Sequence, residues 1–188
     1  MKKLDIVAYI LFFLIIGGYC FKKNVIDENK NRKIFDNKLK NGETDFQNMI
    51  ISHRDLTEKN FSNKIFNNST FIKSEFNLSN LNFIKARNAN FSSTRMEYVS
   101  MKYADVSESN FSGSSLNISV FTGTIFYKCN LSFVDFSDSI LDKADLLEAN
   151  LKHATFKGAS FKGTKVDSVW HQYLLKQGVK HYDKIIWY

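Results

Sequence analysis

The sequence predicts an all-β solenoid in which the chain winds into a square coil, and two columns of side chains predict it. In the first column, every fifth residue from Phe46 to Val166 is apolar, and 12 of the chain's 18 phenylalanines fall there. In the second column, two residues earlier, nearly all residues from Ser69 to Thr164 are small or β-branched. Neither an α-helix nor a β-strand repeats every five residues, so a solenoid with a corner in each repeat is the simplest explanation.

A chain that turns a corner every five residues completes a coil in about 20 residues, and neighbouring coils then pair like strands about 4.8 Å apart. One large and one small side chain of each repeat point inward, and the other three point outward. We expect about six such coils over residues 46–168, giving a rod roughly 30 Å long. Because large apolar side chains fill the interior, it leaves no room for a ligand.

The N-terminal residues 1–23 form a separate apolar segment. Lys2 and Lys3 precede an uncharged, almost wholly apolar stretch over residues 6–21. This length is slightly short for a spanning helix, which needs about 20 apolar residues, but Leu4 and snorkelling of the flanking lysines extend the segment enough to span. Residues 4–21 therefore predict a retained transmembrane anchor. A cleaved signal segment and a buried soluble helix stay open as alternatives.

The orientation of the body relative to a membrane is predicted only weakly. The lysines that follow the apolar segment, Lys22 and Lys23 among them, favour a cytoplasmic C-terminal side by the positive-inside rule. The short basic start followed at once by an apolar run favours export instead. We expect a bacterial inner-membrane protein with a periplasmic body, and a secreted or periplasmic protein after cleavage or a cytoplasm-facing body stays open.

Both ends of a solenoid need covers, because an open end exposes core side chains and unpaired strand groups. Residues 24–45 are predicted to be a linker and N-terminal cap, in which Ile34, Phe35 and Leu39 favour a short helix. Residues 169–188 are predicted to be a C-terminal cap with a short helix that ends near Gly178. Its apolar side chains are candidates for contact with a second chain: Trp170, Leu174, Ile186 and Trp187.

No pattern in the sequence predicts catalysis, a cofactor or a metal site. The four histidines lack metal-ligand spacing, and Cys129 has no cysteine neighbour. The net charge of +7 is spread thinly, without the dense basic block of a nucleic-acid tail. Four asparagines spaced by 20 residues predict a hydrogen-bonded ladder on one side of the coil: Asn90, Asn110, Asn130 and Asn150.

The repeat also resembles a known family. The stretches "ADLLEANLKHATFKGASFKG", from Ala144 to Gly163, and "ADVSESNFSGSSLNI", from Ala104 to Ile118, look like consecutive copies of the pentapeptide-repeat motif. The resemblance to pentapeptide-repeat proteins implies a right-handed quadrilateral β-helix, and a possible homodimer through the C-terminal segment. Some family members mimic DNA and protect a type II topoisomerase. That role needs a negative rod, whereas residues 46–166 carry 14 Lys or Arg against 11 Asp or Glu.

What remains informative is the outside of the coil, where the repeat does not require apolar residues. Three outward columns on one side do carry them: Leu78, Tyr98 and Ile118; Val120 and Ile140; Phe83 and Tyr103. Clustered exposed apolar residues favour an interaction surface. The sequence thus predicts a non-enzymatic, membrane-tethered module that binds a protein partner, most concretely a toxin or effector that it neutralises. A structural envelope module or a secreted effector is the alternative.

Overall fold

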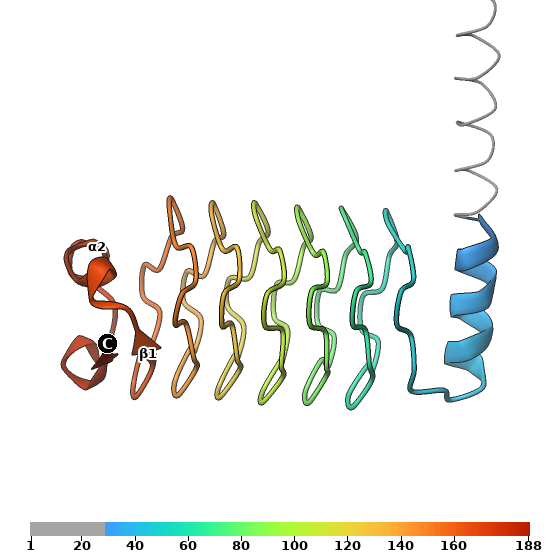
Figure 1. The fold of residues 1–188 in the computed structure, drawn as a ribbon, viewed down its shortest axis with the longest axis horizontal. Coiled ribbons are helices and arrows are strands. Elements are labelled where there is room, and N and C mark those ends of the chain that lie inside the picture. The colour runs from blue at the N-terminus through green and yellow to red at the C-terminus, as the bar shows by residue number, and fades with distance from the viewer. Residues whose placement is uncertain (1–28) are drawn as a thin grey trace, which may run out of the picture.

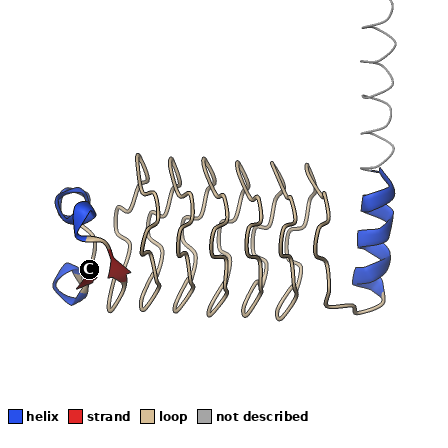
Figure 2. Cartoon of the chain, viewed as in Figure 1, coloured by secondary structure: helices blue, strands red, loops and turns tan. Residues whose placement is uncertain are grey.

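A computed structural model describes residues 29–188, which form a solenoid closed at both ends (Figure 1). Single residues of neighbouring coils pair in parallel, each with the residue 20 positions later, from Asp45 with Ile65 to Asp145 with Lys165. The predicted square-coil β-helix is therefore confirmed. Figure 2 draws most of the coil as loop, because each side pairs through one residue and not through a longer strand.

Each corner of the coil is a tight turn. The second residue of every turn, from Asn48 to Gly163, has a positive φ. A positive φ at this place, followed by a hydrogen bond such as that from the Lys64 N–H to the Phe61 carbonyl at 3.1 Å, matches a type II turn. The five-residue period thus combines a short extended side with a two-residue turn.

The large inward column forms the core. Its phenylalanines from Phe46 to Phe161 are fully buried, and their rings contact from coil to coil. Phe91 stacks on Phe71 and on Phe111, with ring centroids 5.2 Å and 4.9 Å apart. Each such side chain contributes about 1.5–3 kcal/mol of transfer free energy, so the column is the main source of stability.

The small inward column does more than save space. The Ser69 hydroxyl donates a hydrogen bond to the Phe46 carbonyl at 2.7 Å and accepts one from the Met49 N–H at 3.1 Å. Ser74, Ser79 and Ser119 repeat the donation to the carbonyl 23 residues earlier. A hydroxyl therefore links the backbone of each coil to the coil before it, and no buried oxygen of these serines lacks a partner.

The predicted asparagine ladder is present as a column, but its hydrogen bonds run mostly within each coil. The Asn90 side-chain oxygen accepts a hydrogen bond from the Ser92 N–H at 3.0 Å, and Asn110 does the same with Ser112. One bond joins neighbouring coils, from the Asn150 amide to the Asn130 oxygen at 3.4 Å. These asparagine side chains mainly stabilise the start of the turn that follows them.

A helix over residues 29–40 covers the N-terminal end of the coil and runs across it (Figure 1). Its Phe35 is fully buried, with its ring centroid 5.2 Å from that of Phe46. Asp36 forms an ion pair with Arg54 at 2.6 Å, and the Arg32 guanidinium donates a hydrogen bond to the Ser52 carbonyl. Ile34 instead is partly exposed.

The C-terminal end is covered by a compact segment. It comprises the strand β1 (Lys165–Val166), the 3-10 helix η1 (Ser168–Trp170), the helix α2 (His171–Gln177), the 3-10 helix η2 (Tyr182–Lys184) and the strand β2 (Ile186–Trp187). Strands β1 and β2 pair in parallel, so the last strand continues the coil. Helix α2 ends at Gly178, whose φ is 64°, and Leu174 closes the core.

The first coil is more regular than its side chains suggest. The residues Arg54, Lys59 and Lys64 interrupt the small column, yet the bridges are regular from Asp45 onward. Arg54 reaches out to Asp36, and Lys64 reaches the Glu43 carbonyl at 2.6 Å. Arg54 and Lys64 fit here because, at the end of the coil, they reach groups of the N-terminal cap instead of the next coil.

The predicted membrane or signal segment, residues 1–23, lies outside the described residues. Within residues 29–188, no helix combines the length and the apolar character that crossing a bilayer requires.

Candidate binding surface

The register gathers the predicted apolar columns on one side of the solenoid. Ser100 pairs with Asn80 before it and with Val120 after it, and Val120 pairs with Ile140. We call this column, together with the turn before and the turn after each of its residues, the apolar side. Its apolar members are Leu78, Phe83, Tyr98, Tyr103, Ile118, Val120 and Ile140.

Most of these side chains are half-exposed. The exposed fractions are 54% for Tyr98, 56% for Tyr103 and 40% for Ile140. Leu78, Phe83 and Ile118 are exposed to a similar degree, whereas Val120 is less exposed. Large apolar surface that stays in water contributes nothing to folding, so the fold alone does not account for these residues.

The backbone conformation at several of these places disfavours large apolar residues. Leu78, Tyr98 and Ile118 occupy the positive-φ place of their turns, with φ of 61°, 58° and 52°. This conformation favours Gly and Asn and disfavours bulky side chains. Ile118 is the one β-branched residue at a positive φ among residues 29–188. Local stability would be better served by Asn at these places.

The two aromatic residues at the other edge form a ladder. Phe83 stacks on Tyr103, with ring centroids 5.6 Å apart and planes at 15°. The next residue in this column is Gly123, and a Cβ atom there would lie 2.6 Å from the Tyr103 ring. The absence of a side chain at Gly123 thus lets the Tyr103 ring lie flat along the turn, and both rings present a continuous aromatic edge.

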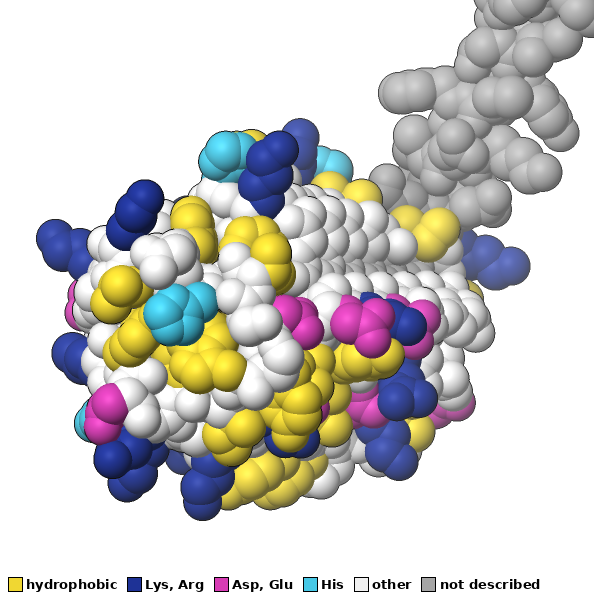
Figure 3. Space-filling view, turned by 60° about the vertical axis from the view of Figure 1, so that its left-hand side comes forward, with side chains coloured by type: hydrophobic (Ala, Val, Ile, Leu, Met, Phe, Trp, Pro, Cys, Tyr) yellow, Lys and Arg dark blue, Asp and Glu magenta, His cyan; other side chains and the backbone are white. Residues whose placement is uncertain are grey.

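At the centre of the apolar side, polar groups are paired with one another. The Asn82 side-chain oxygen accepts hydrogen bonds from the Ser100 hydroxyl at 2.8 Å and the Lys102 N–H at 2.7 Å. Figure 3 shows hydrophobic side chains gathered in patches on the molecule with charged side chains beside them. A surface whose polar groups are already paired loses little hydrogen bonding when a partner covers it.

Other exposed apolar residues lie apart from this side. Phe133 is 64% exposed and stacks on His153, with ring centroids 4.7 Å apart. Ile125 lies on a neighbouring side, and Ile50, which our sequence reasoning missed, is 52% exposed in the first coil. The outward place of Ile50 in the five-residue repeat is the signal that would have identified it.

The C-terminal residues predicted to contact a second chain need one correction. Leu174 is fully buried against the core of its own chain, so it has no surface to offer. Trp170 and Trp187 are half-buried and also pack on the core. Of the predicted set, Ile186 is well exposed, and its exposed neighbours are Val169, Leu175 and Tyr188.

No grouping of the described residues suggests catalysis. Among residues 29–188, no three His, Cys, Asp or Glu side chains lie together as metal ligands would. Burial raises the pKa of the Cys129 thiol to about 12, and its sulfur contacts the Val106 carbonyl at 3.0 Å. A thiol that stays protonated is a poor nucleophile, so Cys129 has a packing role.

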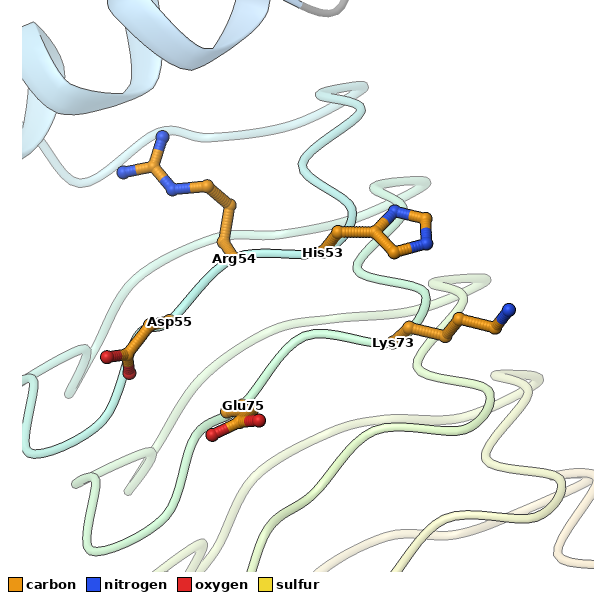
Figure 4. Close-up of a pocket in the computed structure, with 5 residues that line it drawn as sticks. All are labelled: His53, Arg54, Asp55, Lys73 and Glu75. Atoms are coloured by element: carbon orange, nitrogen blue, oxygen red, sulfur yellow. The ribbon is translucent and has the colours of Figure 1, made fainter.

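A cleft of about 380 Å³ lies beside the N-terminal helix and is lined by His53, Arg54, Asp55, Lys73 and Glu75 (Figure 4). His53 and Lys73 point outward, and the two carboxylates lie along the next side. The Arg54 guanidinium is already bound to Asp36 through two nitrogens, at 2.6 Å and 3.3 Å. With mixed charges and its arginine occupied, this cleft offers no consistent ligand chemistry.

Comparison with known proteins identifies the repeat. The family model for pentapeptide repeats matches in eight copies, over residues 74–113, 107–142 and 129–166. No curated protein sequence matches this chain.

Several solved structures of pentapeptide-repeat proteins are similar to this chain. HetL from Nostoc sp. strain PCC 7120, described as involved in the regulation of heterocyst differentiation, is 16% identical, with a TM-score of 0.43 over 70% of this chain and 80% of that one. Rfr23 from Cyanothece 51142 is also 16% identical, with a TM-score of 0.42 over 68% and 93%. QnrB1, a plasmid-mediated fluoroquinolone resistance protein, is 17% identical, with a TM-score of 0.37 over 62% and 76%. The eight matched repeats over residues 74–166 and the square coil show that the chain is a pentapeptide-repeat protein, a family whose fold is the right-handed quadrilateral β-helix.

Proposed function

We propose that this protein is a non-enzymatic, membrane-tethered module whose apolar side binds and neutralises a protein toxin or effector. The observation that carries the proposal is the cluster of half-exposed apolar residues on one side, five of them at positive-φ backbone positions that disfavour bulky side chains. Interface cores are rich in aromatic and apolar anchors that become fully buried on binding. Tyr98 and Tyr103 are the natural anchors here.

The tether rests on residues 4–21, and the proposed location is the bacterial inner membrane with the body in the periplasm. A reporter fused after Tyr188 tests this orientation. An alkaline phosphatase fusion should be active and a cytoplasmic reporter inactive. The opposite pattern would exclude neutralisation in the periplasm while leaving the apolar side available to a cytoplasmic partner.

The binding test uses a triple variant of the apolar side, Tyr98→Asp, Ile118→Asp and Ile140→Asp. Full-length protein solubilised in detergent captures partners from cells, and the affinity of each captured protein is then measured directly. We expect the triple variant to bind at least tenfold more weakly, because three carboxylates would have to be desolvated in the interface. Equal affinity of both proteins would show that this side is not the site.

The chain offers a matched control. Ile125 occupies the same place in its repeat as Ile140, and the two are 39% and 40% exposed. Ile125→Asp therefore matches the single change Ile140→Asp, with the same charge at equal exposure on a different side of the coil. It should leave the partner affinity unchanged.

Neutralisation is tested in cells that produce the captured partner. Growth should stop when the partner is made alone and resume when this protein is made with it. The apolar-side triple variant should fail to rescue growth although it accumulates to the same level. A partner that is harmless by itself would contradict the toxin version of the proposal and favour a structural envelope role.

A second chain could also pack on the C-terminal cap, where exposed apolar residues surround Ile186. We propose a homodimer through Val169, Leu175, Ile186 and Tyr188. Light scattering of the detergent-solubilised protein should give the mass of two chains, and Ile186→Asp combined with Val169→Asp should give one. A single chain in the unmodified protein would exclude the dimer.

A further inference from the structure

The side opposite the apolar side has an unusual charge pattern. We call it the asparagine side: the column through Asn90, Asn110, Asn130 and Asn150, together with the two residues of the turn that follows each strand. None of its residues is Asp or Glu. From the first coil to the last they are Ile50, Ser52, His53, Thr70, Ile72, Lys73, Asn90, Ser92, Ser93, Asn110, Ser112, Gly113, Asn130, Ser132, Phe133, Asn150, Lys152 and His153.

The two adjoining sides differ sharply from it. Equivalent places on the side that follows carry six carboxylates: Asp55, Glu58, Glu75, Glu97, Asp135 and Asp138. Equivalent places on the side that precedes it carry five more: Asp45, Asp105, Glu108, Asp145 and Glu148. Equivalent places on the apolar side carry one carboxylate, Asp142, so the absence of acid separates the asparagine side most clearly from its two neighbours.

The described chain begins on this same side. In the first turns of the helix over residues 29–40, Arg32 reaches the carbonyl of Ser52, in the first turn of the asparagine side. At the other end of the helix, Lys38 reaches the Asp45 carbonyl. Figure 1 shows this helix crossing the end of the solenoid and not continuing its axis. The 28 residues before the described chain, which include the apolar residues 6–21, therefore join it at the flank of the rod.

Apolar and basic side chains stand at both ends of the asparagine side. Near the helix, Ile50 is 52% exposed beside Ile72 and the exposed Lys73. Four coils away, or about 19 Å at the strand spacing, Phe133 is 64% exposed beside Lys152 and His153. Between these ends the side carries small uncharged residues, so no bulky side chain would keep a flat bilayer at a distance from it.

We propose that the asparagine side lies on an anionic lipid bilayer, so that the rod rests along the membrane and presents its apolar side away from it. Lys73 and Lys152 then meet lipid phosphates, and Phe133 and Ile50 enter the interfacial region, as amphipathic surfaces do. An acid-free side fits a negative surface better than the adjoining sides, which carry six and five carboxylates. The proposal rests on the proposed tether but not on the identity of any protein partner.

The test compares two labels on full-length protein in liposomes. Ser112 and Thr122 each occupy the first place of a turn and are half-buried, but Ser112 lies on the asparagine side and Thr122 on the apolar side. Each is changed to Cys in a Cys20→Ser background and labelled with a fluorophore, since the buried Cys129 stays unreactive. Nitroxide groups on the lipid headgroups then quench whichever label is near the membrane.

In liposomes of phosphatidylcholine and phosphatidylglycerol at 3:1, we expect quenching at residue 112 to be at least threefold stronger than at residue 122. Lys73→Glu with Lys152→Glu, or liposomes of phosphatidylcholine alone, should abolish the difference. Equal quenching at both labels, none at either, or stronger quenching at residue 122 would overturn the orientation.

Flotation of the same liposomes separates this proposal from the tether itself. Protein that floats with the liposomes but shows equal quenching keeps its tether and loses only the orientation. Protein that does not float overturns the tether and the orientation together. The binding test of the apolar side in detergent is independent of both results.

Discussion

At the scale of single residues, the solenoid separates two demands that most proteins combine. Inward places accept only side chains that fill the core, and outward places accept almost any residue that tolerates a tight turn. Twenty residues other than glycine adopt a positive φ in the turns of the coil. A bulky residue there is held by its neighbours against its own backbone preference. Ile118 therefore allows the contribution of a side chain to stability and to partner binding to be measured separately.

Ile118→Asn should raise stability and weaken partner binding. Asn adopts a positive φ more readily than a β-branched residue, and we expect the free energy of unfolding to rise by about 0.5–1 kcal/mol. Urea unfolding followed by circular dichroism measures the change. Lys128→Asn, at the equivalent place of another turn, is the control for a gain unrelated to β-branching. A loss of stability in Ile118→Asn would show that Ile118 serves the fold.

Cys129 should be chemically silent in the native protein. Its thiol is buried and its pKa is raised to about 12, chiefly by burial, so the thiolate is nearly absent at neutral pH. With Cys20→Ser as background, iodoacetamide at pH 8 should leave Cys129 unmodified by mass spectrometry and modify it fully in 6 M guanidinium. Rapid modification of the native protein would mean that the coil opens at this level.

At the scale of elements, the two caps solve the same problem differently. The helix over residues 29–40 inserts one aromatic ring into the open end, whereas the C-terminal segment continues the coil through strand β2 and adds Leu174 from helix α2. Helix α2 spans seven residues, too short to be stable without this packing. Both caps are stabilised by packing on the end of the core that they cover.

Phe35→Ala should therefore destabilise the protein strongly. A fully buried phenylalanine truncated to alanine typically costs about 3–5 kcal/mol. Ile34→Ala on the same helix, where the side chain is partly exposed, should cost less than about 1 kcal/mol. Urea unfolding of both variants in detergent measures the difference. Similar losses in the two would mean that helix content, and not the inserted ring, maintains the cap.

The sequence predicts the coil but not the side-chain contacts on its surface. The columns of the core follow from the five-residue period, since inward places admit few residue types. The stack of Phe133 on His153 and the contact of Tyr103 with Gly123 depend on side-chain rotamers at the turns, which the period does not determine. The burial of Leu174 depends on how helix α2 folds back, and an apolar helical face alone could not distinguish the chain's own core from a second chain.

At the scale of the whole molecule, the pairing of each residue with the one 20 positions later sets every surface. Inserting one pentapeptide keeps every inward residue inward but turns all later residues by one side of the square. The apolar side would then be divided between two faces. An insertion of four pentapeptides restores the alignment and only lengthens the rod.

This distinction gives a test that separates folding from surface. A copy of residues 106–110 inserted after Asp105 should leave the melting temperature within a few degrees, because each inserted residue finds an equivalent place in the repeat. Affinity for the partner should fall at least tenfold. Insertion of a copy of residues 106–125 after the same residue is the length control and should keep Leu78 and Ile140 on one face. Unchanged affinity after the short insertion would show that the partner does not span both halves of the side.

The uniform stacking of the coils also has a consequence for the shape of a partner. Outward columns repeat at the strand spacing of about 4.8 Å, whereas the turns of an α-helix repeat at about 5.4 Å. A helix laid along the rod would drift out of step by about half a coil over four turns. A β-sheet whose strands run across the rod has the same spacing and stays in step over any length. The spacing of the columns on the apolar side therefore equals the strand spacing of a β-sheet, and each further coil adds one more matched strand.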